Sequence, residues 1–288
     1  MGKGPPLVKA AHWLTHLQYD LESPVYRHTV RELSRDNSYV RYDERGCGLS
    51  DWDVPDYSFD TWVRDLESVV DSLRLERFSL LGSSQGGPVS IAYAVSHPER
   101  VSHLILYGAF ARGWKRRNLS SEELEEMNAR ISLTKTGWGR DNAAYRQIFT
   151  SNFIPDGTLE QIRWFNDLQR FSTSPENAVR FLTEFGNIDV LDLLPRISVP
   201  TLVLHARQDA MIQFEHGRQL ASMIPTARFV PLEGKNHFLL EDEPAWTQFL
   251  REVRHFIGVR EEISSGSPSK AVELGISGWL KGPKKGEA

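Results

Sequence analysis

The chain has 288 residues, of which 40% are hydrophobic and 25% are charged, a composition typical of a globular protein with a sizeable core. Lys and Arg total 34 against 38 Asp and Glu, and the resulting formal charge of -4 disfavours general binding to nucleic acid or to an anionic membrane surface. The single cysteine, Cys47, excludes an intrachain disulfide and a structural zinc site built on several thiolates.

The beginning of the sequence predicts no targeting segment. The first apolar stretch, from Leu7 to Leu14, is interrupted by Lys9 and His12, and it is too short and too polar for a signal peptide. No run of the chain approaches the roughly 18 to 20 apolar residues that span a bilayer. We therefore expect a cytoplasmic protein with no membrane partner.

Short apolar runs alternate along the chain with stretches of helical periodicity. The expected strands are Leu7–Ala11, Ser38–Tyr42, Phe78–Gly82, Val101–Tyr107, Thr201–His205 and Arg228–Pro231. The helical patterns lie at about Pro24–Ser34, Phe59–Leu73, Gly86–Ser96, Glu215–Ser222 and Pro244–Phe256. Strand and helix in regular alternation predict the α/β class, with a mostly parallel sheet flanked by helices.

This alternation stops after Tyr107, and the next buried run begins only at Thr201. The intervening patterns predict helices at Ser121–Arg130, Asn142–Phe149, Leu159–Phe171 and Pro175–Phe185. We expect residues 112–187 to form a helical cap, inserted into a core made of residues 1–111 and 188–258. The cap is rich in aromatic residues, most of which should form its own core while others cover an apolar pocket. Residues 259–288, rich in Gly, Ser, Pro and Lys, predict a disordered tail.

The most specific motif is Gly82-Ser83-Ser84-Gln85-Gly86, which matches G-x-S-x-G between an expected strand and an expected helix. Small residues two positions before and after a serine allow the strand and the helix to approach closely around a sharp turn. Such a turn projects the serine hydroxyl outward and points backbone N–H groups at the group that it attacks. The motif predicts Ser84 as a nucleophile.

A serine hydroxyl needs a base within hydrogen-bond reach and a third group that orients this base. His237 follows the last expected strand in a glycine-containing loop before the final helix. Asp209 lies just beyond the carboxyl end of the preceding strand, at the edge of the sheet where Ser84 also emerges. The chain order Ser84, Asp209, His237 predicts a catalytic triad.

With these residues in place, the sequence resembles the α/β-hydrolase superfamily, in its group of capped esterases and perhydrolase-like serine hydrolases. The resemblance extends from about Leu7 to Ile257. Besides the triad, it rests on Asp43-Glu-Arg-Gly-Cys-Gly-Leu-Ser-Asp51, similar to the family's D-x-R-G-x-G-x-S-D loop, and on Val199-Pro-Thr-Leu-Val-Leu-His205 before the acid. In the loop we interpret Asp43 and Arg45 as structural partners.

The resemblance also implies an oxyanion hole and two departures from the family pattern. The N–H after the nucleophile belongs to Gln85, and the family's H-G-x appears as His12-Trp13-Leu14, which implies the N–H of Leu14 with Trp13 nearby. Trp13 in place of glycine changes the backbone available there. The N-terminal β-hairpin of the family is missing, which leaves an open sheet edge, and pairing of that edge with a second copy would give a homodimer.

The sequence therefore predicts a serine hydrolase that cleaves small-molecule carboxylic esters through an acyl-enzyme, without cofactor or metal. Two alternatives use the same fold. One is a carbon–carbon bond hydrolase or an acyltransferase with the same triad and a different pocket. The other is a ligand-sensing regulatory protein that turns over slowly and acts through a partner.

Overall fold

A computed structural model of the protein describes residues 1–141 and 143–258. Six parallel strands form one sheet in the order β2-β1-β3-β4-β5-β6. They are β1 (Pro6–Lys9), β2 (Ser38–Val40), β3 (Phe78–Ser83), β4 (Val101–Tyr107), β5 (Thr201–Ala206) and β6 (Ala227–Leu232). The α/β class expected from the sequence is confirmed, whereas the tail expected over 259–288 lies outside the described residues.

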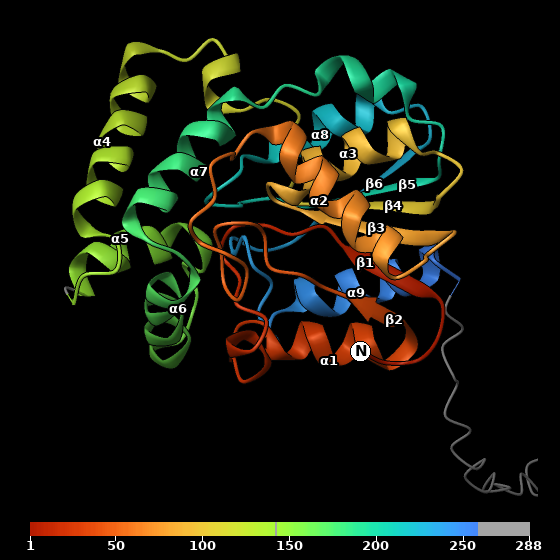
Figure 1. The fold of residues 1–288 in the computed structure, drawn as a ribbon, viewed down its shortest axis with the longest axis horizontal. Coiled ribbons are helices and arrows are strands. Elements are labelled where there is room, and N and C mark those ends of the chain that lie inside the picture. Colours follow the sequence, from red (N-terminus) through yellow and green to blue (C-terminus); the bar gives the residue numbers. More distant parts are fainter. Residues whose placement is uncertain (142, 259–288) are drawn as a thin grey trace, which may run out of the picture.

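Helices cover both faces of the sheet (Figure 1). One face carries α2 (Phe59–Ser72), α3 (Gly86–Ser96) and α8 (Phe214–Met223), and the other carries α1 (Arg27–Asp36) and α9 (Pro244–Phe256). The central strand β3 is buried along its whole length, as a parallel strand between two helix layers must be. This burial explains why Leu80 and Leu81, which point to opposite faces of the strand, are both apolar.

Four helices between β4 and β5 lie beside the core, on the left of Figure 1. They are α4 (Ser121–Gly137), α5 (Ala143–Phe153), α6 (Leu159–Ser172) and α7 (Pro175–Asn187). Short 3-10 turns at Tyr19–Leu21, Trp114–Arg116 and Leu191–Arg196 complete the described elements. None of the helices in the described ranges combines the length and the apolarity that a bilayer crossing requires.

The predicted end of the helix at Ser121–Arg130 is wrong, because α4 continues to Gly137. Its last turns contain the β-branched Thr134 and Thr136, which are weak helix formers. Packing overrides this preference. Trp138, directly after the helix, donates from Nε1 to the carbonyl oxygen of Thr173 (3.0 Å) and stacks on Trp13 of the core with ring centroids 5.2 Å apart.

The outer edge of β2 faces no further strand within residues 1–141 and 143–258. Met1 occupies part of this edge. Its amino group donates to the carbonyl oxygen of Tyr39 (2.9 Å), and its own carbonyl oxygen accepts from the N–H of Tyr39 (2.7 Å). These two bonds satisfy the outward backbone groups of one residue of β2. Homodimerisation through this edge stays a prediction.

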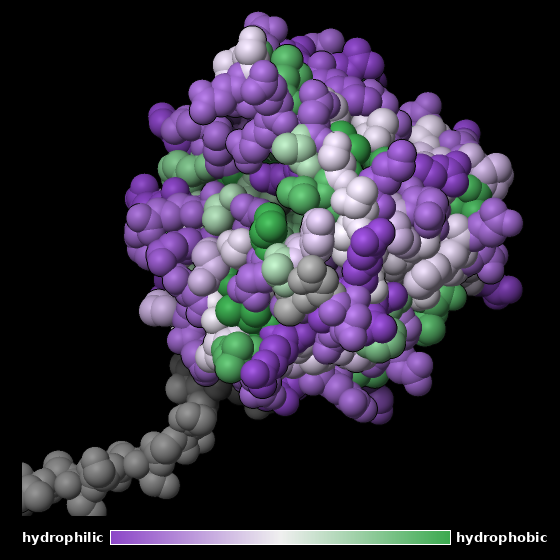
Figure 2. All heavy atoms as spheres, turned by 90° about the vertical axis from the view of Figure 1, so that its left-hand side faces the viewer, coloured by the Kyte–Doolittle hydropathy of each residue, from purple (hydrophilic) through white to green (hydrophobic). Residues whose placement is uncertain are grey.

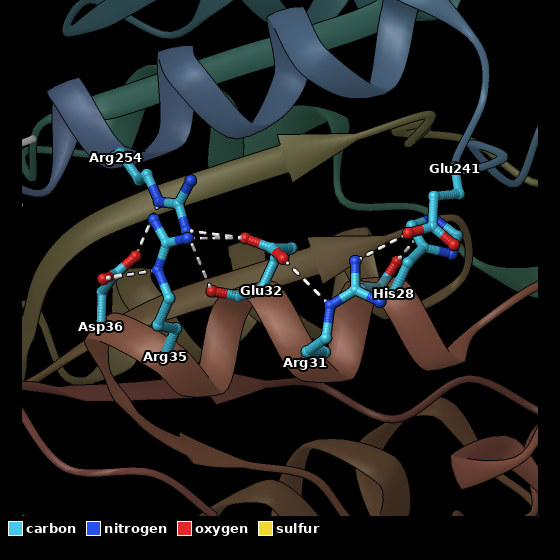
Figure 3. Close-up of polar contacts among 8 residues, drawn as sticks. His28, Arg31, Glu32, Arg35, Asp36, Glu241 and Arg254 are labelled. Carbon is cyan, nitrogen blue, oxygen red and sulfur yellow. Dashed lines mark hydrogen bonds and ion pairs between the residues drawn. The ribbon is translucent and has the colours of Figure 1, made fainter. Parts of the chain in front are cut away.

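Ion pairs tie α1 to α9 across the second face of the sheet (Figure 3). Arg254 of α9 pairs with Asp36 (2.7 Å) and Glu32 (3.1 Å) of α1. Arg31 of α1 reaches Glu241 (2.7 Å) in the loop that precedes α9. Because Arg254 is largely covered while it serves two carboxylates, this pairing should hold the two helices together more firmly than isolated surface pairs do.

Candidate active site

Ser84 occupies the turn between β3 and α3 in a left-handed backbone conformation, with φ of 51°. This conformation is costly for any residue but glycine, so the surroundings must hold it. The N–H of Ser84 donates to the carbonyl oxygen of Tyr107 on β4 (3.0 Å). A Cβ atom on Gly82 would lie 2.7 Å from the carbonyl oxygen of Gly86, so glycine at 82 permits the close approach of strand and helix. The motif thus forms the sharp strand-to-helix turn expected of it.

Asp209 follows β5 and is held by three hydrogen bonds. Its Oδ1 accepts from the N–H groups of Met211 and Ile212, each at 2.9 Å, and its Oδ2 lies 2.8 Å from Nδ1 of His237. Burial opposes ionisation, but the charge and hydrogen bond of His237, with the N–H of Ile212, outweigh it and keep the pKa of Asp209 below its usual value. The carboxylate is therefore charged and aimed at the imidazole.

His237 lies between the core and the cap. The backbone N–H of His237 donates to the carbonyl oxygen of Phe153 at the end of α5 (2.8 Å). Because Asp209 accepts at Nδ1, this nitrogen carries the proton and Nε2 is left as an acceptor. Nε2 is buried and has no hydrogen-bond partner in the described part of the chain, Ser84 included. An imidazole with an orientated tautomer and a free Nε2 is suited to take a proton.

Gly108, which the sequence reasoning missed, lies between the turn at Ser84 and the side chains of His237 and Asp209. It follows Tyr107, whose carbonyl oxygen holds the turn at Ser84, and it has φ of 52°. A Cβ atom at this position would lie 3.0 Å from Cε1 of His237 and 3.4 Å from Oδ2 of Asp209. The absent side chain lets the imidazole pack against the end of β4, next to the nucleophile turn. A glycine directly after a buried strand was the available signal.

The predicted oxyanion-hole residues lie on neighbouring segments but differ in exposure to the cavity. Trp13 and Gln85 line the same cavity as Ser84, whereas the Leu14 side chain is fully buried in the core. Within the described chain, no hydrogen bond occupies the backbone N–H of Gln85, Trp13 or Leu14. The carbonyl oxygen of Trp13 accepts from the thiol of Cys47 (2.6 Å). The lone cysteine thus helps to position this segment.

The D-x-R-G-x-G-x-S-D loop, residues 43–51, forms hydrogen bonds with the segment that follows Trp13 and Leu14. Asp43 accepts from Thr15 Oγ1 (2.8 Å) and from the N–H groups of Leu17 (3.0 Å) and Leu49 (2.9 Å). Arg45 contacts both oxygens of Asp65 at 2.6 Å. Both side chains are structural partners, as their positions in the motif suggested.

Glu44 of the same loop is a buried carboxyl that the sequence reasoning did not single out. It accepts from Nε2 of Gln85 at 2.7 Å. Burial raises the pKa of Glu44 to about 8, helped by Asp65 and opposed by the bond from Gln85 and by the charges of Arg45 and Lys9. Oε2 of Glu44 and Oε1 of Gln85 are both buried without a hydrogen-bond partner among the described residues. A protonated Glu44 can supply the O–H that this pair lacks.

We expect Glu44→Gln to change how stability depends on pH. The folded protein holds this proton to about pH 8, whereas an unfolded glutamate loses it near 4.5, so the wild-type free energy of unfolding should fall as pH rises through this range. The variant lacks this titration and can still pair with Gln85. The free energy of unfolding of the variant, minus that of the wild-type protein, should therefore increase by up to about 1.4 kcal/mol per pH unit between pH 5 and 8. Urea unfolding at a series of pH values measures this difference. Glu125→Gln, on the exposed surface of α4, is the matched control, and a difference independent of pH would contradict the assignment.

A cavity of about 240 Å³ opens beside Ser84. Trp13 and Gln85 line it from the core, and of the cap aromatics Trp114, Phe153 and Phe185 reach it. The expectation that most of the other cap aromatics pack among themselves is wrong, because they also contact rings of the core: Trp138 stacks on Trp13, Trp164 and Phe171 contact Tyr19, Phe181 contacts Tyr57 and Trp62, and Phe165 contacts Phe238. The outer face of the cap carries hydrophobic groups among hydrophilic ones (Figure 2), and its exposed apolar side chains include Leu133 and Ile148.

Comparison with known proteins found matches to the sequence and to the fold. The family model described as "alpha/beta hydrolase fold" matches residues 21–244. The chain is 28% identical over 251 residues to the AB hydrolase superfamily protein YisY of Bacillus subtilis (strain 168). This match covers 84% of the chain and 88% of YisY. It is 28% identical over 207 residues to the putative carbamate hydrolase RutD of Pseudomonas savastanoi pv. phaseolicola, with 71% of this chain and 78% of the relative covered.

Among solved structures, the esterase EaEST from Exiguobacterium antarcticum matches with a TM-score of 0.74 and 25% identity. The match covers 90% of this chain and 93% of the esterase. These three proteins are named as hydrolases or as an esterase, and the names of RutD and EaEST refer to different bonds, a carbamate and an ester.

Proposed function

We start from the fact that the chain belongs to the α/β-hydrolase-fold family, and we propose that it is a serine hydrolase that cleaves carboxylic esters through Ser84, His237 and Asp209. The observation that carries this proposal is the orientated imidazole. Asp209 lies 2.8 Å from Nδ1 of His237, while Nε2 is buried, has no hydrogen-bond partner among the described residues, and lies next to the turn that presents Ser84 to a cavity. This arrangement meets the needs of a hydroxyl nucleophile.

In the proposed reaction, the Ser84 hydroxyl attacks the ester carbonyl carbon while Nε2 of His237 takes its proton. The resulting imidazolium is stabilised by Asp209 and returns the proton to the departing alcohol. An acyl-enzyme remains on Ser84. Water then attacks the acyl carbon, again giving its proton to His237, and the carboxylic acid leaves as the serine hydroxyl is restored.

The developing oxyanion needs donors that are fixed before the reaction. We assign the first to the N–H of Gln85 and the second to the backbone of Trp13 and Leu14. Gln85 is held by Glu44, and the carbonyl oxygen of Trp13 is held by Cys47. These supports keep both segments in place without a contribution from the substrate.

The bond that is cleaved can be tested directly. We expect a fluorophosphonate probe to label Ser84, and p-nitrophenyl esters of increasing chain length to be hydrolysed with kcat above about 1 s⁻¹. An aryl carbamate and a vinylogous diketone, assayed in parallel, test carbamate cleavage and carbon–carbon bond hydrolysis. Turnover of only the carbamate or only the diketone would contradict ester cleavage. Labelling of another residue would contradict the assignment of Ser84 as nucleophile. Negligible turnover with ligand-dependent capture of a partner would favour a regulatory role. A cytoplasmic location is part of the same proposal.

A further inference from the structure

We propose that the cavity beside Ser84 selects esters that carry a carboxylate on their acyl chain, and that Arg117 binds this carboxylate. The inference rests on the proposed function, because the ester carbonyl must lie at Ser84. Arg117 lies in the segment that leads from β4 into the cap, and it lines the same cavity of about 240 Å³ as Ser84. An anion at Arg117 and a carbonyl at Ser84 would therefore occupy the same cavity.

Arg117 has an unusual environment for an arginine. Its side chain is half-buried, yet it makes no ion pair with any carboxylate of residues 1–141 and 143–258. Nε is buried and no described residue accepts a hydrogen bond from it, whereas Nη1 donates to Nε2 of His216 on α8 (2.8 Å). Burial lowers the pKa of Arg117, and the charge of Glu123 opposes this effect only in part. A partly desolvated cation without a counter-ion costs free energy, which an anionic ligand would recover.

The neighbouring arginines of the cavity differ from Arg117 in this respect. Arg112 contacts both oxygens of Asp189 at 3.1 and 3.2 Å, and Arg130 pairs with Glu126 at 3.2 Å. Glu123 also lines the cavity, but its carboxylate accepts from the N–H of Ser120 (2.8 Å) as part of the capping box of α4. Among the arginines of this cavity, Arg117 is thus the one without a carboxylate within ion-pair distance in residues 1–141 and 143–258, and only the more distant charge of Glu123 offsets its own.

His216 positions this cation without neutralising it. Burial, with the charges of Arg117 and His205, lowers the pKa of His216 to about 4. The imidazole is therefore neutral near pH 7 and accepts one N–H of the guanidinium. A guanidinium has five N–H donors, of which His216 engages one, so the Nη1 and Nη2 groups keep further N–H donors for a ligand. Two parallel N–H bonds match the two oxygens of a carboxylate, which makes such contacts strong and directional.

The side chains around the cavity indicate what joins the two ends of the substrate. Met127, Leu182 and Phe185 line it together with Ser84 and Arg117. These apolar groups suit a methylene chain between the ester carbonyl and the anion. The half-esters of straight-chain dicarboxylic acids have this chemistry.

Matched pairs of substrates test the inference. One member is the mono-p-nitrophenyl ester of adipic, pimelic or suberic acid, and the other carries an isopropyl group in place of the free carboxylate. We expect the wild-type protein to prefer the anionic member by about 10- to 100-fold in kcat/KM for at least one chain length, mainly through KM. Arg117→Met should abolish the preference and Arg117→Lys should retain part of it. Because both substrates are measured on one preparation, incomplete folding of a variant cancels from the ratio.

Arg116→Met is the matched control, because Arg116 donates to the carbonyl oxygen of Asn187 and does not line this cavity. It should keep the wild-type ratio. Equal ratios in the wild-type protein and Arg117→Met, with the neutral esters hydrolysed, would overturn the inference and leave the proposed function intact. If no ester is hydrolysed, the proposed function fails. Calorimetry then tests separately whether Arg117 binds a carboxylate, with adipate as the ligand. Adipate binding that Arg117→Met abolishes supports the anion site, and no binding to the wild-type protein overturns it.

Discussion

Ser84→Ala is expected to lower kcat for p-nitrophenyl esters by a factor of about 10⁶. Without the hydroxyl no acyl-enzyme can form, and only binding and the oxyanion donors remain to accelerate attack by water. The left-handed turn should tolerate alanine as well as serine, because neither side chain is branched at Cβ. Steady-state rates, measured with protein free of wild-type contamination, give this ratio directly.

Ser83→Ala is the control for this substitution. Ser83 ends β3 immediately before the nucleophile and is buried, so the two variants disturb the same turn. The Ser83 variant should keep most of the activity, and both should unfold near the wild-type temperature. Ester hydrolysis by Ser84→Ala at a rate close to that of the wild-type protein would remove Ser84 from the mechanism.

Asp209→Asn is expected to lower kcat by about 10³- to 10⁴-fold. The amide nitrogen of asparagine can donate to Nδ1 of His237, which would leave the proton on Nε2, where the base must accept one. The imidazolium would also lose the charge that stabilises it. The loss should appear in kcat, with KM changed little, because Asp209 is fully covered and does not line the cavity.

The exposed Asp192 provides a matched control, since Asp192→Asn removes the same charge away from the site. It should retain wild-type kcat. His205 is a second imidazole near the carboxylate, with Nε2 3.6 Å from Oδ2, but this nitrogen is engaged by the carbonyl oxygen of Ile212 (2.8 Å). Activity of Asp209→Asn within tenfold of wild type would show that another group orientates His237.

Local patterns were sufficient to predict the sheet with its flanking helices and the sharp turn at Ser84. Strand β4 and helices α3 and α9 have the bounds expected from the sequence. In β4, the run from Leu104 to Tyr107 is apolar because it is buried on both faces, and α9 buries a stripe of period 3.6 against the sheet. Ser84 was identifiable because its motif is itself a turn between two such elements.

Tertiary structure alone decided the surroundings of that serine. The contact of Glu44 with Gln85 joins residues 41 positions apart, and that of Arg117 with His216 joins residues 99 positions apart. The sequence suggested Asp209 and His237 as partners through their places after adjacent strands, but only the folded chain gives their 2.8 Å contact and the role of Gly108. Periodicity reports which face of an element is buried. It does not report which loops meet, or which buried charge is left without a counter-ion, because these depend on how distant segments pack.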